Sequence, residues 1–257
     1  MRSGRRLGLT CARRVGDLGA DIMANAMRSS FLRTFKEALT HIGSRMPDPA
    51  LHQLQMVVNY MKLGRWMERR GFRAPHRVRN RTMVFETVAA RIRDRDVLYL
   101  EFGVFKGESM RFWSQALRHP SAKLHGFDSF EGLPEDFDFI GKYGKGHFDV
   151  GGQLPQIDDA RVVFFKGWFE QTVPGYQPPP HDVLVINLDA DLFSATKLVL
   201  DHLRPWIKPG TLIYFDDMSR PDHEPRAFDE FMTATGRRFE LVVIEQSLNR
   251  GFFECVA

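Results

Sequence analysis

The sequence predicts an α/β fold built on one open sheet of seven strands, mostly parallel with one antiparallel edge strand, and preceded by a helical segment. From Asp96 onward, short apolar runs alternate with stretches of helical periodicity, which is typical of β-α-β units. The first runs are almost continuously apolar, as expected for strands covered on both faces. Only residues 246–250 separate the last two runs, too few for a parallel crossover, so this pair must form a hairpin.

The individual elements follow from these runs. The expected strands cover residues 97–104, 123–128, 161–166, 183–189, 211–215, 239–245 and 251–256. Between them, helices are expected to begin near Glu108, Ser194 and Glu224. Residues 131–160, rich in Gly and Asp, form a long insertion after the second strand, and loops of that length are usually functional or mobile.

Residues 1–95 are predicted to form a helical lid or extension, distinct from a ligand-binding domain over residues 96–257. Apolar residues recur there at i, i+4, i+8 and i+11, which indicates an amphipathic helix: Phe31, Phe35, Leu39 and Ile42. A second helix is expected after the Pro-Asp-Pro sequence at 47–49, and a third over about 82–92. Amphipathic helices of this kind are compatible with a homodimer.

Charge is distributed unevenly along the chain. Residues 1–96 contain 20 Lys and Arg against 8 Asp and Glu, whereas residues 97–257 contain 16 against 24. A basic segment of this kind could contact nucleic acid, a membrane surface or an anionic substrate, or it could form a solvated face or dock on the acidic part.

Cysteine usage and hydropathy limit the class of protein. Cys11 and Cys255 stand at opposite ends of the chain, with no disulfide framework and no metal-binding spacing, which favours a reducing compartment and a cytoplasmic location. We find no apolar run long enough for a transmembrane helix. The Arg-rich first 14 residues lack the apolar stretch of a signal peptide, so we interpret them as a tail.

Residues 101–109, Glu-Phe-Gly-Val-Phe-Lys-Gly-Glu-Ser, combine a strand end, a glycine-bearing turn and a helix start. Gly103 and Gly107 allow a ligand to approach the backbone, and the helix start near Ser109 presents free N–H groups to a carboxylate. Glu101 could accept from an ammonium group. This set suits an amino-acid zwitterion better than a diphosphate, whose fingerprint is G-x-G-x-x-G. A purely structural turn is the alternative.

Residues 126–134, Gly-Phe-Asp-Ser-Phe-Glu-Gly-Leu-Pro, end the second expected strand with Asp128. An acidic residue at this place hydrogen-bonds ribose hydroxyls in nucleotide-binding α/β folds. Phe130 could cover an adenine. Asp128 follows Glu101 by 27 residues, about one β-α-β step, which favours the ligand interpretation over a helix cap.

Two acidic pairs each end an apolar strand and therefore project to the same rim of the sheet: Asp189 with Asp191, and Asp216 with Asp217. Carboxylates gathered in this way repel one another and need a cation or shared protons. Oxygen ligands favour Mg²⁺ or Ca²⁺ over zinc. Such an ion could hold substrate oxygens while a nearby carboxylate takes a proton. Helix caps, or contacts to an ammonium group without metal, are the alternatives.

Gly167 and Trp168 follow the third expected strand and are placed to form an adenine wall, although Trp168 could instead be a core aromatic. The histidines show no metal-binding spacing and are interpreted as surface or loop residues. His147 and His223 lie in long loops at the rim and are candidate bases facing a substrate.

Five motifs in consecutive order resemble the macrocin O-methyltransferase family, which includes methyltransferases acting on sugar moieties of antibiotics and other glycosides. They lie at residues 100–107, 126–135, 166–169, 189–197 and 209–217. The resemblance implies a class I methyltransferase fold, binding of S-adenosylmethionine (SAM), O-methyl transfer to a sugar hydroxyl, Mg²⁺ dependence, and a helical lid over the acceptor. Phe193 and Met218 stand where members often have Tyr, which puts acceptor contacts in doubt.

The motifs and the resemblance together predict the functional residues. The expected cofactor contacts are Glu101, Phe102, Gly103, Phe105, Gly107, Ser109, Asp128, Ser129, Phe130, Gly167, Trp168 and Asp189. The expected metal ligands are Asp189, Asp216 and Asp217, and the expected catalytic residues are Asp191, Asp189 and His147.

The predicted activity is thus SAM-dependent, Mg-assisted O-methylation of a sugar, glycoside or glycolipid acceptor. A nucleic-acid methyltransferase guided by the basic segment is one alternative. Against it, the arginines are not interleaved with stacking aromatics and no base-flipping signature appears, so we expect no nucleic-acid partner. A non-catalytic SAM-fold module is the other alternative, which the intact acidic and glycine motifs oppose.

Overall fold

The computed structural model describes residues 29–74, 76–135 and 144–257. The chain divides into two compact units, Met1–Leu54 and Gln55–Ala257. The Arg-rich start of the chain, Cys11 and residues 136–143 of the long insertion lie outside the described residues.

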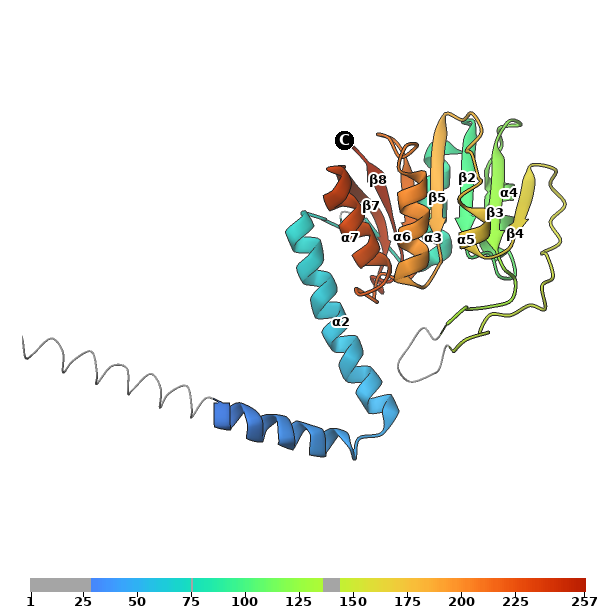
Figure 1. The fold of residues 1–257 in the computed structure, drawn as a ribbon. Helices are drawn as coiled ribbons and strands as arrows, with labels where there is room; N and C mark the ends of the chain where they lie inside the picture. The colour runs from blue at the N-terminus through green and yellow to red at the C-terminus, as the bar shows by residue number, and fades with distance from the viewer. Residues whose placement is uncertain (1–28, 75, 136–143) are drawn as a thin grey trace, which may run out of the picture. The chain divides into compact units, whose positions relative to one another are not determined.

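The second unit is built on one sheet with the strand order β1-β7-β8-β6-β5-β2-β3-β4 (Figure 1). All neighbours are parallel except at β8, which runs antiparallel to β6 and β7. The strands are β1 (Arg77–Val78), β2 (Val97–Phe102), β3 (Lys123–Asp128), β4 (Val162–Lys166), β5 (Val183–Leu188), β6 (Leu212–Phe215), β7 (Phe239–Glu245) and β8 (Gly251–Cys255). The strand order reverses beside β2, because β3 and β4 extend the sheet on one side of it and β5 on the other.

The predicted fold class is confirmed, and each of the seven predicted strands is present within about two residues of its expected ends. The structure adds a short eighth strand, β1, which pairs with β7 at the sheet edge. The β7–β8 hairpin is also present. Its reversed strand β8 lies between β6 and β7. Strand β8 is flanked on both sides because it pairs with both β6 and β7.

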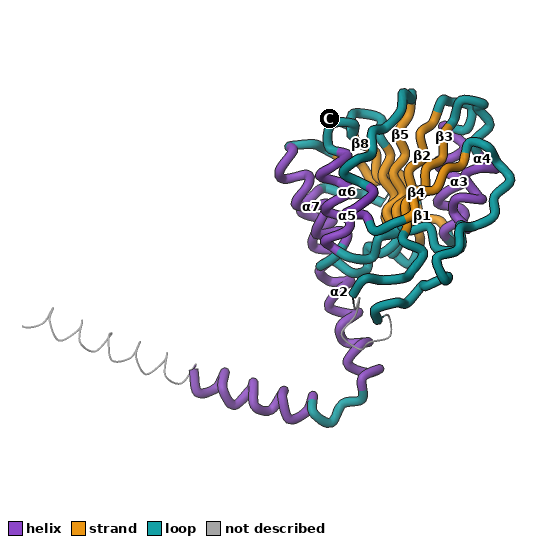
Figure 2. Tube along the Cα trace, turned by 45° about the vertical axis from the view of Figure 1, so that its right-hand side comes forward, coloured by secondary structure: helices purple, strands orange, loops and turns teal. Residues whose placement is uncertain are grey.

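Helices cover both faces of the sheet (Figure 2). One face carries α5 (Phe169–Thr172), α6 (Phe193–Leu203) and α7 (Glu224–Thr235), and the other carries α3 (Arg81–Ile92) and α4 (Glu108–Ala116). Along β2, Leu98, Leu100 and Phe102 pack on the first face, while Val97 and Tyr99 pack on the second. This alternation follows from the two-residue period of a strand and explains why the strand is apolar throughout.

Helix α2 (Asp48–Arg70) crosses from one unit into the other. In the second unit its buried Leu63 and Trp66 join the core beneath α7. The Trp66 indole and the Arg70 guanidinium both donate to the Asp229 carboxylate of α7. Residues 55–95 therefore pack with the sheet, and the predicted functional division at residue 95 stays a prediction.

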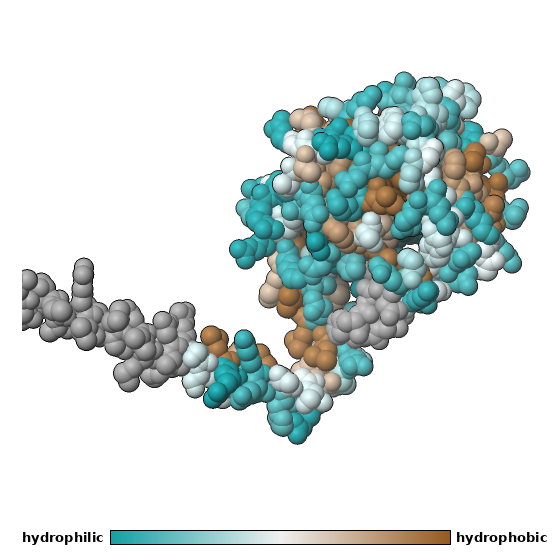
Figure 3. All heavy atoms as spheres, viewed as in Figure 1, coloured by the Kyte–Doolittle hydropathy of each residue, from teal (hydrophilic) through white to brown (hydrophobic). Residues whose placement is uncertain are grey.

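The predicted amphipathic stripe lies on a helix whose described part covers residues 29–43. Its apolar side chains are exposed, as Figure 3 shows in brown, and they include Phe31, Phe35, Leu39 and Ile42. In the described residues, no helix is long and apolar enough to cross a membrane. The predicted homodimer stays a prediction.

Candidate active site

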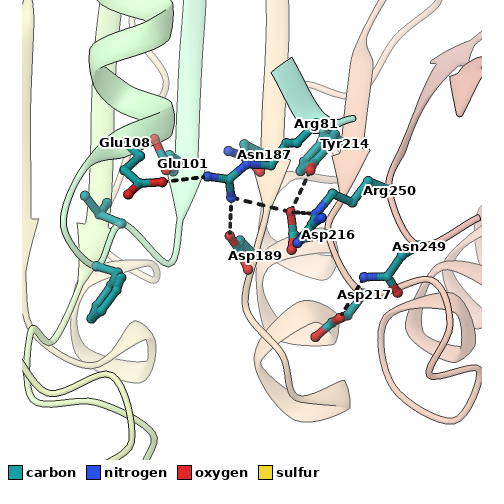
Figure 4. A network of polar contacts seen from close by, with 12 residues as sticks. Arg81, Glu101, Glu108, Asn187, Asp189, Tyr214, Asp216, Asp217, Asn249 and Arg250 are labelled. Atoms are coloured by element: carbon teal, nitrogen blue, oxygen red, sulfur yellow. Dashed lines mark hydrogen bonds and ion pairs between the residues drawn. The ribbon is translucent and has the colours of Figure 1, made fainter. Parts of the chain in front are cut away.

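Polar side chains gather at the carboxyl ends of β2, β5 and β6 (Figure 4). Strand register aligns Glu101 with Asn187, and Asn187 with Tyr214. All three side chains lie on the same face of the sheet as the core residues that pack against α3 and α4. Asp189 follows Asn187 by two residues, and Asp216 follows Tyr214 by two residues, so both belong to the same face. Three neighbouring parallel strands thus bring a row of polar groups to one side of the sheet rim.

Glu101 is buried and has few polar neighbours. The Tyr99 hydroxyl donates to its Oε2 at 3.1 Å, and the Asn187 amide donates to the same hydroxyl oxygen at 2.7 Å. Burial raises the pKa of Glu101 to about 8, although Tyr99 and the charge of Arg81 act in the opposite direction. The Asn187 Oδ1 atom is buried without a hydrogen-bond partner among the described residues. This part of the rim therefore offers acceptors for a cationic donor.

Asp128 organises the turn that follows β2. Its Oδ2 accepts the backbone N–H groups of Val104 and Phe105, both at 2.8 Å, and its Oδ1 accepts the N–H of Phe130 at 2.7 Å. A carboxylate has about four acceptor positions, so three are used here. One acceptor position of the Asp128 carboxylate therefore remains for the predicted ribose contact.

The two glycines of this turn have left-handed backbone conformations, with φ of +93° at Gly103 and +74° at Gly107. A side chain at Gly103 would collide with the carbonyl oxygen of Asp189, so the β2 turn lies directly against the end of β5. Gly107 is the N-cap of α4, and no side chain caps the first N–H groups of that helix. The turn thus exposes backbone donors next to the acidic rim.

Asp189 and Asp216 are accompanied by two arginines that the motifs did not include. Arg250 donates to Asp216 Oδ1 at 2.9 Å, and the Tyr214 hydroxyl donates to the same atom at 2.6 Å. Arg81 Nη1 lies 3.7 Å from Asp216 and 3.8 Å from Asp189. Burial, followed by the charge of Asp216, raises the pKa of Asp189 well above its usual value.

A second acidic pair lies beside the first. The carboxyl groups of Asp191 and Asp217 are close enough to shift each other's pKa. Burial, then the neighbouring Asp217, raises the pKa of Asp191 well above its ordinary value. The Asp217 backbone N–H donates to Glu224, a buried side chain at the start of α7, and Asn249 contacts Asp217 Oδ1 at 3.4 Å. Asp191 has a left-handed backbone, at φ +57°, a conformation found at functional sites when the surrounding structure holds it.

The arrangement of the carboxylates decides whether they can hold a metal ion. Their oxygen donors are of the type that Mg²⁺ prefers. In the parts of the chain that the structure describes, however, no three acidic, histidine or cysteine side chains are placed to hold one ion. Guanidinium groups accompany Asp189 and Asp216. As arranged, these residues do not fit a divalent ion, because the guanidinium groups already balance the charge of these two carboxylates.

The remaining predicted residues differ in how close they lie to the rim. Phe102 is a core residue whose ring stacks on Phe127 with 4.7 Å between centroids, so only its backbone faces the rim. Phe130 is also buried, with its ring edge against Phe164. Phe105 is half-buried and touches Phe148.

Ser109 and Ser129 are buried near the two turns, and the Ser129 hydroxyl accepts the N–H of Glu131. Gly167 follows β4 and donates its N–H to the backbone oxygen of Asp128, which places the half-buried Trp168 beside the end of β3. His147 is exposed and packs on Phe148. Its predicted catalytic role stays a prediction.

Sequence reasoning missed several rim residues: Arg81, Tyr99, Asn187, Tyr214, Glu224 and Arg250. Asn187 is a polar residue inside an otherwise apolar strand, and this pattern could have marked it as a functional residue. Arg81 and Arg250 gave no local signal, because only the strand order brings α3 and the β7–β8 turn to this rim.

Comparison with known proteins identifies the domain. Residues 100–218 match a family model described as a methyltransferase domain. This part of the chain is similar to a methyltransferase domain. The match covers β2 to β6 with the acidic rim, so it contains most of the site described above.

Two curated proteins are similar to this chain. It is 31% identical over 136 residues to 8-demethyl-8-(2,3-dimethoxy-alpha-L-rhamnosyl)-tetracenomycin-C 4'-O-methyltransferase of Streptomyces olivaceus, covering 46% of this chain and 51% of that protein. It is 26% identical over 167 residues to mycinamicin III 3''-O-methyltransferase of Micromonospora griseorubida, covering 57% and 65%. The chain thus spans between half and two thirds of these relatives. Both are O-methyltransferases by name, which confirms the resemblance seen in the motifs.

Solved structures agree on the fold. The calicheamicin methyltransferase CalS11 matches with a TM-score of 0.50 and 21% identity, covering 67% of this chain and 76% of that chain. The O-methyltransferase NovP matches with a TM-score of 0.50 and 22% identity, covering 68% and 78%. At these identities the similarity shows a shared fold.

Proposed function

We propose that this protein is a SAM-dependent O-methyltransferase that methylates a hydroxyl group of a sugar or glycoside. The observation that carries the proposal is the rim itself, where a left-handed glycine turn after β2 lies against the acidic end of β5, beside the reversal of strand order. Ligands of open α/β sheets bind at this place. The names of the two curated relatives support a sugar-linked hydroxyl as the acceptor.

In this proposal the methionine part of SAM lies over Gly103. Its ammonium group is placed near Glu101 and Asp189, and the unpaired Oδ1 of Asn187 offers a further acceptor in the same row. The ribose extends toward the remaining acceptor position of Asp128, and the adenine toward Trp168. A cationic ammonium beside Glu101 favours the ionised form of that buried carboxyl group.

Methyl transfer needs a base for the acceptor hydroxyl, and we assign that role to Asp191. A raised pKa brings a carboxylate closer to the working pH of a general base, and Asp217 can share the proton. Bound SAM would supply the methyl group for the acceptor oxygen and would leave as S-adenosylhomocysteine, while Asp191 would accept the proton of the acceptor hydroxyl. Holding the two reactants in line is the main source of rate. No step of this mechanism uses a metal ion, since the carboxylates as arranged do not fit one.

The acceptor is proposed to bind between the rim and helix α2. Lys62 of α2 forms an ion pair with Asp222 at 2.7 Å, which fixes α2 beside the loop between β6 and α7. That loop also holds Asp217 and His223. Residues 55–70 are therefore the part of the predicted lid that contacts the loop carrying Asp217.

The proposal is tested by calorimetric titration with S-adenosylhomocysteine and by methyl transfer from labelled SAM to a panel of rhamnosides and other glycosides. We expect binding and transfer for the wild type, and a loss of transfer with retained binding for Asp191→Asn. Asp201→Asn, an exposed α6 residue paired with Lys197, is the matched control and should keep both. Absence of S-adenosylhomocysteine binding by the wild type would end the proposal.

A further inference from the structure

Arg81 stands out among the rim residues because it comes from outside the predicted domain. It is the first residue of α3, and its side chain reaches the ends of β5 and β6. Its Nη2 atom lies 3.2 Å from Glu108 Oε2 on α4. One guanidinium group thus lies among carboxylates from three elements (Figure 4).

The contacts of this guanidinium leave most of its donors available. The distances to Asp189 and Asp216, 3.8 and 3.7 Å, are too long for hydrogen bonds. The one hydrogen bond that Arg81 forms among the described residues goes to Glu108, whose side chain is 74% exposed. An Arg side chain has five N–H donors in a planar fork that matches a carboxylate.

The surroundings also point to a carboxylate ligand. Glu108 is the first residue of α4, so the uncapped N–H groups at the start of this helix are close to the Arg81 guanidinium. A helix start of this kind favours a negative charge. Directly beside the guanidinium, Asp189 and the unpaired Asn187 Oδ1 offer acceptors for an ammonium group. The rim therefore places groups for both charges of an amino-acid zwitterion side by side.

We propose that Arg81 binds the α-carboxylate of the methionine moiety of SAM. The inference rests on the proposed function, because it names a contact within the same cofactor site. A structural role, in which Arg81 only ties α3 to the sheet, is the competing explanation. The two differ in what they predict for a ligand that lacks the carboxylate.

The experiment measures binding of SAM and of decarboxylated SAM, which keeps the sulfonium and the ammonium but has no carboxylate. For the wild type we expect SAM to bind at least about tenfold more tightly than decarboxylated SAM, the size of one charge-assisted contact. In Arg81→Gln we expect the Kd for SAM to rise by about the same factor while the Kd for decarboxylated SAM stays unchanged. Arg91→Gln is the matched control on the same helix, since Arg91 pairs with Glu254 at the far end, and it should keep the preference.

The outcomes separate the two explanations. Equal weakening of both ligands by Arg81→Gln, or no change in either, would overturn the assignment. If Arg81→Gln fails to fold, the wild type still tests the assignment, because equal affinity for the two ligands would overturn it. A wild type that binds neither ligand would instead refute the proposed function and the assignment with it.

Discussion

The Tyr99 hydroxyl donates a hydrogen bond to Glu101 at 3.1 Å in a part of the sheet where both side chains are buried. The two residues are neighbours on one face of β2, and Asn187 of β5 donates to the hydroxyl from the adjacent strand. A carboxyl group that is buried with one neutral donor is easier to keep protonated than ionised. Burial outweighs this hydrogen bond and raises the pKa of Glu101 to about 8, so its protonation changes slightly above neutral pH.

Glu101 should make the free energy of unfolding fall as the pH rises. Its pKa is about 8 in the folded protein, well above the ordinary value of a glutamate, so folding takes up a proton between these two pH values. The stabilising contribution of the protonated form is fully present below the ordinary pKa and is lost as the pH approaches 8. One proton gives a slope of about 1.4 kcal/mol per pH unit.

Urea unfolding of the ligand-free protein at pH 5.5 and pH 7.5 (about two units apart) measures this slope. Glu101→Gln, which mimics the protonated form, should lose less stability than the wild type between these conditions. Equal losses in the two proteins would contradict a raised pKa at Glu101.

Cofactor binding near neutral pH should release a proton. The ammonium group of SAM, placed beside Glu101, lowers the pKa of that carboxyl group by charge attraction, so the proton of the ligand-free state leaves on binding. Calorimetry with S-adenosylhomocysteine in buffers of different ionisation enthalpy counts this proton. We expect release of up to about one proton at pH 7 in the wild type and clearly less in Glu101→Gln.

Replacement of Asp128 should affect both stability and cofactor affinity. Its carboxylate accepts three backbone N–H groups, so Asp128→Ala leaves these donors without their acceptor. We expect a loss of roughly 2–4 kcal/mol in the free energy of unfolding, together with weaker S-adenosylhomocysteine binding. Asp159→Ala removes a carboxylate that is bonded to Arg161 away from the rim. It should cost stability without a specific effect on S-adenosylhomocysteine affinity, and equal effects on affinity would contradict the prediction.

Arg81 should oppose the binding of divalent cations at the rim. Its guanidinium lies within 4 Å of both Asp189 and Asp216, so an ion that used these carboxylates would be repelled. We expect Arg81→Gln to bind Mn²⁺ on the order of tenfold more tightly than the wild type, measured by the electron paramagnetic resonance signal of free Mn²⁺. Arg91→Gln should leave Mn²⁺ affinity unchanged, and an unchanged affinity in Arg81→Gln would show that Arg81 does not control the charge of this rim.

Local sequence determined the sheet of this protein and most residues of its rim. Apolar runs bounded by turn residues fixed the strands, and the Gly103 turn and the acidic pairs marked the strand ends where a ligand site of this fold forms. These features depend on short windows of sequence, because strand burial and turn conformation are set by neighbouring residues.

Only the tertiary structure decided what accompanies these residues. Arg81 stands more than 100 positions before Asp189 in the chain, yet the strand order places it among the rim carboxylates, whose charges Arg81 and Arg250 balance. In the same way, the backbone groups bound to Asp128 are set by the close approach of β2 and β3. Contacts of this kind follow from the packing of distant segments, and no short window of sequence contains them.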